Sequence, residues 1–94
     1  MSFKQISVQT CLIYRAVRNA KDWTTVREIV DSTDANPRTV RNTLQAMKTA
    51  GLLDAHSTFA GYRYKAATVV RPDAQEIINR IVRAEKTLGL TEAP

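Results

Sequence analysis

The segment from Thr24 to Lys65 constrains the fold more than any other part of the chain. Its apolar residues recur at helical spacing, are interrupted by a short polar stretch at residues 32–35, and recur at helical spacing again after Asn36. An Ala-Gly-Leu-Leu sequence at residues 50–53 then precedes two short stretches typical of strands. This order predicts a helix, a tight turn, a second helix and a β-hairpin.

Local signals predict where these two helices begin and end. Thr25 and Glu28 fit a capping box, in which the Thr25 hydroxyl accepts from the Glu28 amide and the Glu28 side chain reaches back. Asn36 is a favourable N-cap, and Pro37 suits the first helical position because its missing N–H costs nothing there. We expect the second helix to reach about residue 49, and Gly51 to follow it in a left-handed conformation.

The rest of the chain is expected to complete one domain. Apolar spacing predicts a first helix over residues 7–20, and Trp23, the only tryptophan, is expected to fill the core. The hairpin strands are predicted at residues 52–59 and 62–67, with Tyr62 and Tyr64 packing the sheet on the core. Pro72 begins a last helix that reaches about residue 88.

These elements predict a mostly α (α+β) class. We expect a three-helix core with a β-hairpin wing at residues 1–70. A C-terminal helix follows at residues 71–90, and residues 91–94 are expected to form a frayed tail.

Positive charge is concentrated on parts of this predicted unit. The chain has 14 Lys and Arg residues against 9 Asp and Glu residues, a formal charge of +5. Residues 1–22 carry +3 and residues 36–65 carry +4, whereas residues 23–35 carry −2 and residues 66–94 are neutral. A polyanionic partner explains this bias, but charge alone fits a merely soluble basic domain about equally well.

The second helix of the motif has two chemically different faces. Val40, Leu44 and Met47 recur on the side expected to face the core. The other side carries long polar residues: Arg38, Arg41, Asn42, Gln45 and Lys48. The DNA major groove admits one α-helix, where arginine binds guanine and Asn or Gln binds adenine. The helix therefore has the composition of a DNA-reading element.

Residues 36–53, with the sequence Asn-Pro-Arg-Thr-Val-Arg-Asn-Thr-Leu-Gln-Ala-Met-Lys-Thr-Ala-Gly-Leu-Leu, resemble the second half of a bacterial winged helix-turn-helix regulator. The resemblance extends over residues 10–67 and is closest to small MarR-, GntR- or IclR-like domains. Two features depart from that pattern, because the turn before residue 36 lacks a glycine and the wing is short.

The resemblance implies that this face reads bases, that Thr39 touches a phosphate or a thymine methyl, and that the wing touches phosphates or the minor groove. The expected DNA-contacting residues are Asn36, Arg38, Thr39, Arg41, Asn42, Gln45, Lys48, Arg63 and Lys65.

The last helix carries a wide apolar stripe that permits two arrangements. It can pack on the first helix of the same subunit, or it can pair with the same helix of a second subunit in a two-fold dimer. We favour a homodimer, because the stripe is wider than one small domain needs. The expected dimerisation residues are Ile77, Ile78, Ile81, Val82 and Leu88.

Enzymatic and metal-binding chemistry finds little support in the sequence. Cys11 is the only cysteine and His56 the only histidine, and no phosphate-binding glycine motif occurs. We expect Cys11 to be a small core residue, although a site combining Cys11, His56 and a carboxylate stays formally open. We therefore expect no enzyme, no cofactor, no metal and no evident small-molecule ligand.

No apolar run approaches the roughly 20 residues needed to cross a bilayer, and the first residues lack a signal peptide. The expected location is therefore cytoplasmic and nucleoid-associated. The predicted function is sequence-specific binding of double-stranded DNA by a transcriptional regulator of the repressor type. The alternatives are a winged-helix protein–protein adaptor, or a plasmid or phage replication or partition DNA-binding protein.

Overall fold

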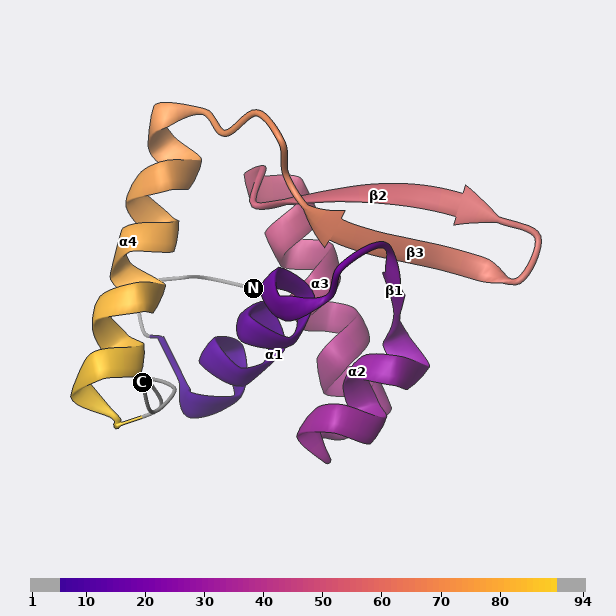
Figure 1. Cartoon of the computed structure of the whole chain (residues 1–94), viewed down its shortest axis with the longest axis horizontal. Helices are drawn as coiled ribbons and strands as arrows, with labels where there is room; N and C mark the ends of the chain where they lie inside the picture. The colour runs from indigo at the N-terminus through magenta and orange to yellow at the C-terminus, as the bar shows by residue number, and fades with distance from the viewer. Residues whose placement is uncertain (1–5, 90–94) are drawn as a thin grey trace.

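The computed structural model describes residues 6–89, so the predicted tail at residues 91–94 lies outside the described part of the chain. Four helices and a three-stranded sheet form the fold (Figure 1). In chain order the elements are α1 (Val8–Asn19), β1 (Thr24–Thr25), α2 (Val26–Thr33), α3 (Pro37–Ala50), β2 (Leu53–Thr58), β3 (Gly61–Ala66) and α4 (Pro72–Thr87). The predicted α+β architecture of a three-helix core, a hairpin wing and an extra C-terminal helix is confirmed.

The predicted cap of α2 begins that helix in the structure. The hydroxyl of Thr25 accepts a hydrogen bond from the backbone amide of Glu28 at 3.2 Å. The same hydroxyl donates to Glu28 Oε1 at 3.2 Å. The Glu28 side chain thus reaches back to the cap residue, and residue 25 is held in the extended conformation from which α2 starts.

Local residues also set the turn before α3 and the end of α3. Asp34 ends α2 with φ 57°, so it occupies the left-handed turn position without a glycine. Asn36 Oδ1 accepts from the amide of Arg38 at 2.8 Å, and α3 then begins at Pro37. Gly51 follows α3 with φ 90°, as predicted.

The sheet has the order β1-β3-β2 and is antiparallel throughout. Thr24 of β1 and Ala55 of β2 both pair with Tyr64 of the central strand. Thr24 and Tyr64 are buried, so this row lies on the core side of the sheet. The strands end one residue earlier than predicted, because Thr58 pairs with Gly61 and leaves residues 59 and 60 as the turn.

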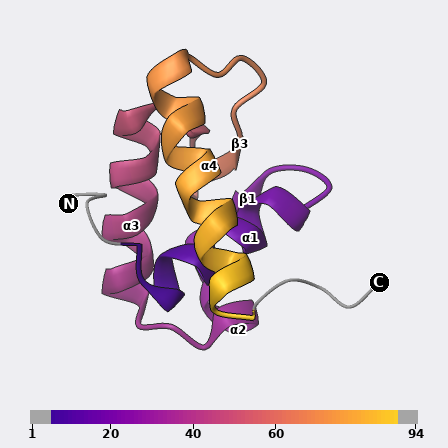
Figure 2. The same ribbon diagram turned by 90° about the vertical axis from the view of Figure 1, so that its left-hand side faces the viewer.

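The buried core joins α1, α2 and α3 to the sheet and to one face of α4. It contains Cys11, Ile13, Tyr14, Val17, Ile29, Ala35, Val40, Leu44, Met47, Leu52, Leu53, Tyr64, Ala74 and Ile81. Helix α4 packs across α1 at the opposite end of the molecule from the hairpin turn (Figures 1 and 2). The hairpin is therefore free to project from the body.

Two aromatic predictions are wrong. Trp23 was expected in the core, but it is 36% exposed and its ring centroid lies 5.9 Å from that of His56. Thr24 is the buried residue instead, because β1 begins there and turns alternate residues to opposite faces. Tyr64 packs in the core as predicted, whereas Tyr62 on the same side of β3 is 53% exposed. Tyr62 lies two residues nearer the hairpin turn, where its ring lines a groove beside α3 instead of entering the core.

The expected place of Ile81 on a dimerisation surface is also wrong. Its side chain is fully buried within the single chain, and the thiol of Cys11 lies 3.8 Å from its carbonyl oxygen. The centre of the α4 stripe thus packs within the chain, with Ile81 against Cys11 of α1 and Ala74 beside Gly51 at the end of α3. Ile77, Ile78 and Val82 flank that centre and are half-buried.

Candidate nucleic-acid interface

Helix α3 presents its long polar side chains to solvent. Every residue predicted to read bases on this helix is exposed, as is Lys48 near its end; these residues are Arg38, Arg41, Asn42, Gln45 and Lys48. Val40, Leu44 and Met47 are fully buried on the opposite side. The helical period therefore separates a core face from a polar face. Asn36 is exposed at the N-cap, and Thr39 is half-buried.

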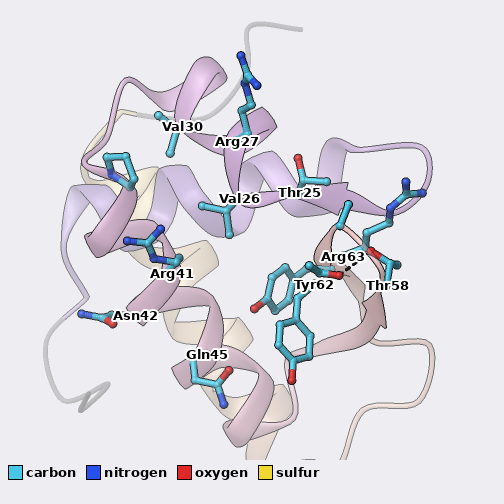
Figure 3. A pocket seen from close by; sticks show the side chains of 14 residues that line it. Thr25, Val26, Arg27, Val30, Arg41, Asn42, Gln45, Thr58, Tyr62 and Arg63 are labelled. Atoms are coloured by element: carbon cyan, nitrogen blue, oxygen red, sulfur yellow. Dashed lines mark hydrogen bonds between the residues drawn. The ribbon is translucent and has the colours of Figure 1, made fainter.

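A groove of about 810 Å³ runs between α2, α3 and the hairpin (Figure 3). It is lined by Thr25, Val26, Arg27, Val30, Pro37, Arg41, Asn42, Gln45, Thr58, Ala60, Gly61, Tyr62, Arg63 and Tyr64. Val26 and Val30 contribute apolar surface from α2, while Arg27, Arg41 and Arg63 bring one guanidinium each from three different elements. The groove therefore combines an apolar wall with arginines from three elements, and Figure 3 shows the guanidinium groups of Arg27 and Arg63 directed outward from it.

The end of α3 is connected to the hairpin by a contact between a cation and an aromatic ring. Lys48 Nζ lies 5.7 Å from the centroid of the Tyr62 ring. The Tyr62 ring in turn lies 6.3 Å from the ring of Tyr64, which is anchored in the core. Tyr62 thus positions the Lys48 ammonium group between helix and hairpin, where the charge stays accessible.

The two predicted basic residues of the wing have different surroundings. Arg63 is exposed and lines the groove. Lys65 does not line the groove, and it pairs across the hairpin with Asp54, so an acidic side chain lies beside it on the same face. Of the two, Arg63 is the better placed for a partner that also touches α3.

The sequence analysis missed Arg27. It is exposed on the first turn of α2 and joins Arg41 and Arg63 around the groove. Its segment, residues 23–35, carries a net charge of −2. A segment with an acidic balance was not expected to contribute a basic residue to the surface. Only the packing of α2 against α3 brings it to this surface.

Burial controls the titration of groups near this surface and in the core. Burial raises the pKa of the Tyr64 phenol, and the nearby Tyr62 raises it further, so the proton is retained. Burial likewise raises the pKa of the Cys11 thiol, with a smaller contribution from the charge of Glu85. Cys11 is fully buried and is thus a core residue, as predicted.

The structure places Cys11 and His56 in different surroundings. Cys11 is buried between α1 and α4, whereas His56 is exposed on β2 beside Trp23. Within residues 6–89, no group of three or more His, Cys, Asp or Glu side chains is arranged to hold a metal ion. In that same range, no helix has the length and apolar character that a membrane crossing requires.

Known protein families provide no sequence match: no family model and no curated protein matches this chain. Solved structures do match its fold. BpsR of Bordetella bronchiseptica, whose DNA binding is regulated by 6-hydroxynicotinic acid, superposes with a TM-score of 0.65 at 15% identity, over 90% of this chain and 59% of that one.

Two further solved structures are similar. A MarR family transcription regulator gives a TM-score of 0.61 at 19% identity, over 90% of this chain and 54% of its own. A MarR/EmrR family regulator from Acinetobacter sp. ADP1 gives 0.56 at 17% identity, over 93% of this chain and 63% of its own. The chain thus spans less than two thirds of each of these structures. The likeness confirms the predicted winged helix-turn-helix fold.

Proposed function

We propose that this chain binds double-stranded DNA in a sequence-specific manner and acts as a transcriptional regulator. The observation that carries the proposal is the exposed polar face of α3 beside a groove with three arginines. A face suited to an apolar protein partner would not place two arginines, an asparagine and a glutamine together on the exposed side of one helix. The similar fold of solved transcription regulators supports the same reading.

In this proposal α3 lies in the major groove. Arg38 and Arg41 are long enough to form paired hydrogen bonds with guanine, and Asn42 and Gln45 form the corresponding pairs with adenine. Asn36 and Thr39, near the start of the helix, are placed to meet phosphates through the helix N-terminus. The base-reading side chains thus extend over two turns of one helix.

The groove between α3 and the hairpin then receives the sugar-phosphate backbone that separates the major from the minor groove. Arg27 and Arg63 line it from α2 and from the hairpin, and Lys48 lies over the ring of Tyr62, which also lines it. Three cations on three elements hold one strand in a fixed register relative to α3. We assign Lys65 a weaker phosphate contact, because Asp54 offsets part of its charge.

We further propose that the protein represses transcription by occupying its operator, since steric exclusion requires only a DNA-binding surface. Its place of action is then the nucleoid in the cytoplasm. A homodimer completes the proposal, because two copies related by a two-fold axis read a palindromic site. The half-buried flanks of the α4 stripe and Leu88, which is 45% exposed, are available for that contact.

The test is selection of bound sequences from a random duplex pool, repeated at two salt concentrations. We expect an enriched, two-fold symmetric motif. The affinity for it should fall with salt, with a log–log slope of about −0.9 per neutralised phosphate. A pool that shows no enrichment, together with weak and sequence-independent binding, would instead favour the adaptor function.

A further inference from the structure

The end of the hairpin carries an apolar side chain with no contact to the rest of the protein. Phe59 is 112% exposed, more than any other large hydrophobic residue of the described chain. The neighbouring turn residues Thr58, Ala60 and Gly61 line the groove beside α3, but Phe59 does not. The turn between β2 and β3 that carries it lies at the end of the molecule farthest from α4 (Figure 1).

The turn that holds Phe59 is tightly closed. Thr58 and Gly61 pair across the end of the hairpin, and the Thr58 hydroxyl donates to the Gly61 carbonyl at 2.6 Å. Gly61 has φ 119°, a conformation that L side chains rarely adopt. The tip is thus narrow, uncharged and short, and the phenylalanine is its one bulky group.

Positive charge lies just behind this tip. Arg63 is two residues past Gly61 on β3, and strands rise roughly 3.3 Å per residue. The arginine therefore lies about 7–10 Å behind the end of the hairpin. The DNA minor groove is about 7.5 Å deep, so a tip that reaches its floor would bring Arg63 level with the phosphates on its rim.

We propose that Phe59 is an apolar wedge that inserts between two base pairs from the minor groove and bends the duplex. Such wedges partly unstack a base step and kink DNA by about 20–90° toward the major groove. The proposal rests on the proposed function, since α3 in the major groove brings the hairpin to the adjacent minor groove. It adds specificity, because flexible pyrimidine–purine steps unstack most easily.

The experiment uses the full chain and the duplex recovered by selection, with 2-aminopurine at adenines flanking the α3 contact region. Bending is measured from energy transfer between dyes on the two duplex ends. We expect the wild-type protein to raise 2-aminopurine fluorescence at one step and to shorten the end-to-end distance. Phe59→Ala should abolish both signals and weaken binding about tenfold. Phe59→Leu should retain most of the bend, because leucine is also an apolar wedge.

Val69→Ala is the matched control, since Val69 is 86% exposed outside the hairpin and should leave all signals unchanged. Unchanged bending and fluorescence in Phe59→Ala, with wild-type binding intact, would overturn the wedge while leaving DNA binding in place. A change in sedimentation of Phe59→Ala without a change in bending would also overturn it, and would make Phe59 a protein contact. Failure of the wild-type chain to bind any duplex would remove the proposed function itself.

Discussion

Arg18 Nη2 lies 3.2 Å from Glu85 Oε2, and this ion pair joins α1 to α4 across 67 residues of sequence. The Glu85 side chain is 5% exposed and that of Arg18 is 37% exposed. The other carboxylate oxygen, Glu85 Oε1, is buried without a hydrogen-bond partner within residues 6–89. Arg18 also lies 5.7 Å from the centroid of the Tyr14 ring. The arginine thus compensates a carboxylate that would otherwise be buried alone.

Arg18→Ala should lower the free energy of unfolding by about 1–3 kcal/mol, because it leaves the Glu85 charge buried and unpaired. The effect is smaller than for a fully buried pair, since water reaches the arginine. Urea unfolding measures it, and Lys86→Ala, at an exposed site on the same helix, is the control with an expected change within about 0.5 kcal/mol. The double change Arg18→Leu with Glu85→Leu should recover most of the loss. An Arg18→Ala variant with the same free energy of unfolding as the wild type would show that the ion pair contributes nothing to stability.

Arg41→Ala should weaken binding to the selected duplex by about 1–3 kcal/mol, because it removes the base contact proposed for the α3 face. The loss should be much smaller on unrelated duplexes. Fluorescence anisotropy measures the affinity for the selected duplex and for an unrelated duplex. Arg83→Ala, at an exposed site on α4, serves as the matched control. An equal loss on all sequences would make Arg41 a phosphate contact.

Val82→Glu should convert the proposed dimer to monomers, because it places a charge on the half-buried flank of α4. Ile81 is unsuitable for this test, since its burial within one chain means that a charge there would unfold the domain. Analytical ultracentrifugation gives the oligomeric state, and circular dichroism checks that the variant is folded. Glu76→Lys changes an exposed charge on the same helix and should leave the dimer intact. A folded Val82→Glu variant that still sediments as a dimer would contradict this interface.

Stability should fall in alkaline solution above about pH 10. The pKa of Tyr64 is raised above its ordinary value of 10.0, mainly by burial and further by Tyr62. The pKa of Tyr14 is also raised, mainly by burial, with Arg18 opposing the shift and Glu85 adding to it. The folded chain holds these protons more tightly than the unfolded chain. Their stabilising contribution is therefore complete below pH 10 and is lost as the pH rises through the raised values.

Urea unfolding at a series of pH values measures this loss. Tyr14→Phe and Tyr64→Phe should each reduce the dependence of stability on pH above 10, and the double variant should show the weakest dependence. Phenylalanine keeps the ring and removes only the titrating group. Equal slopes in the wild type and the double variant would show that other groups cause the loss.

Much of the fold was predictable because its signals are local. The Thr25 cap, the Asn36-Pro37 start and the left-handed Gly51 each depend on neighbours within about four residues. The exposed face of α3 was also predictable, since a period of 3.6 residues already separates Arg38 and Arg41 from the buried side. These predictions required no knowledge of distant contacts.

The candidate groove was only partly predictable. Arg27, Arg41 and Arg63 belong to three elements, and their convergence depends on how α2 and the hairpin pack beside α3. The contact between Lys48 and Tyr62 likewise requires the hairpin to fold back toward the end of α3. A pattern within one segment contains no information on such distances.

The sequence by itself determined where the helices begin and end, and which side chains share a face. The tertiary structure decided what covers each face: Thr24 rather than Trp23 enters the core, Ile81 packs on α1, and Glu85 is buried against Arg18. The physical reason is that helix and strand periods are set by the local backbone. Burial is set by whichever distant element packs against that surface, and by the hydrogen bonds and charges which that element supplies.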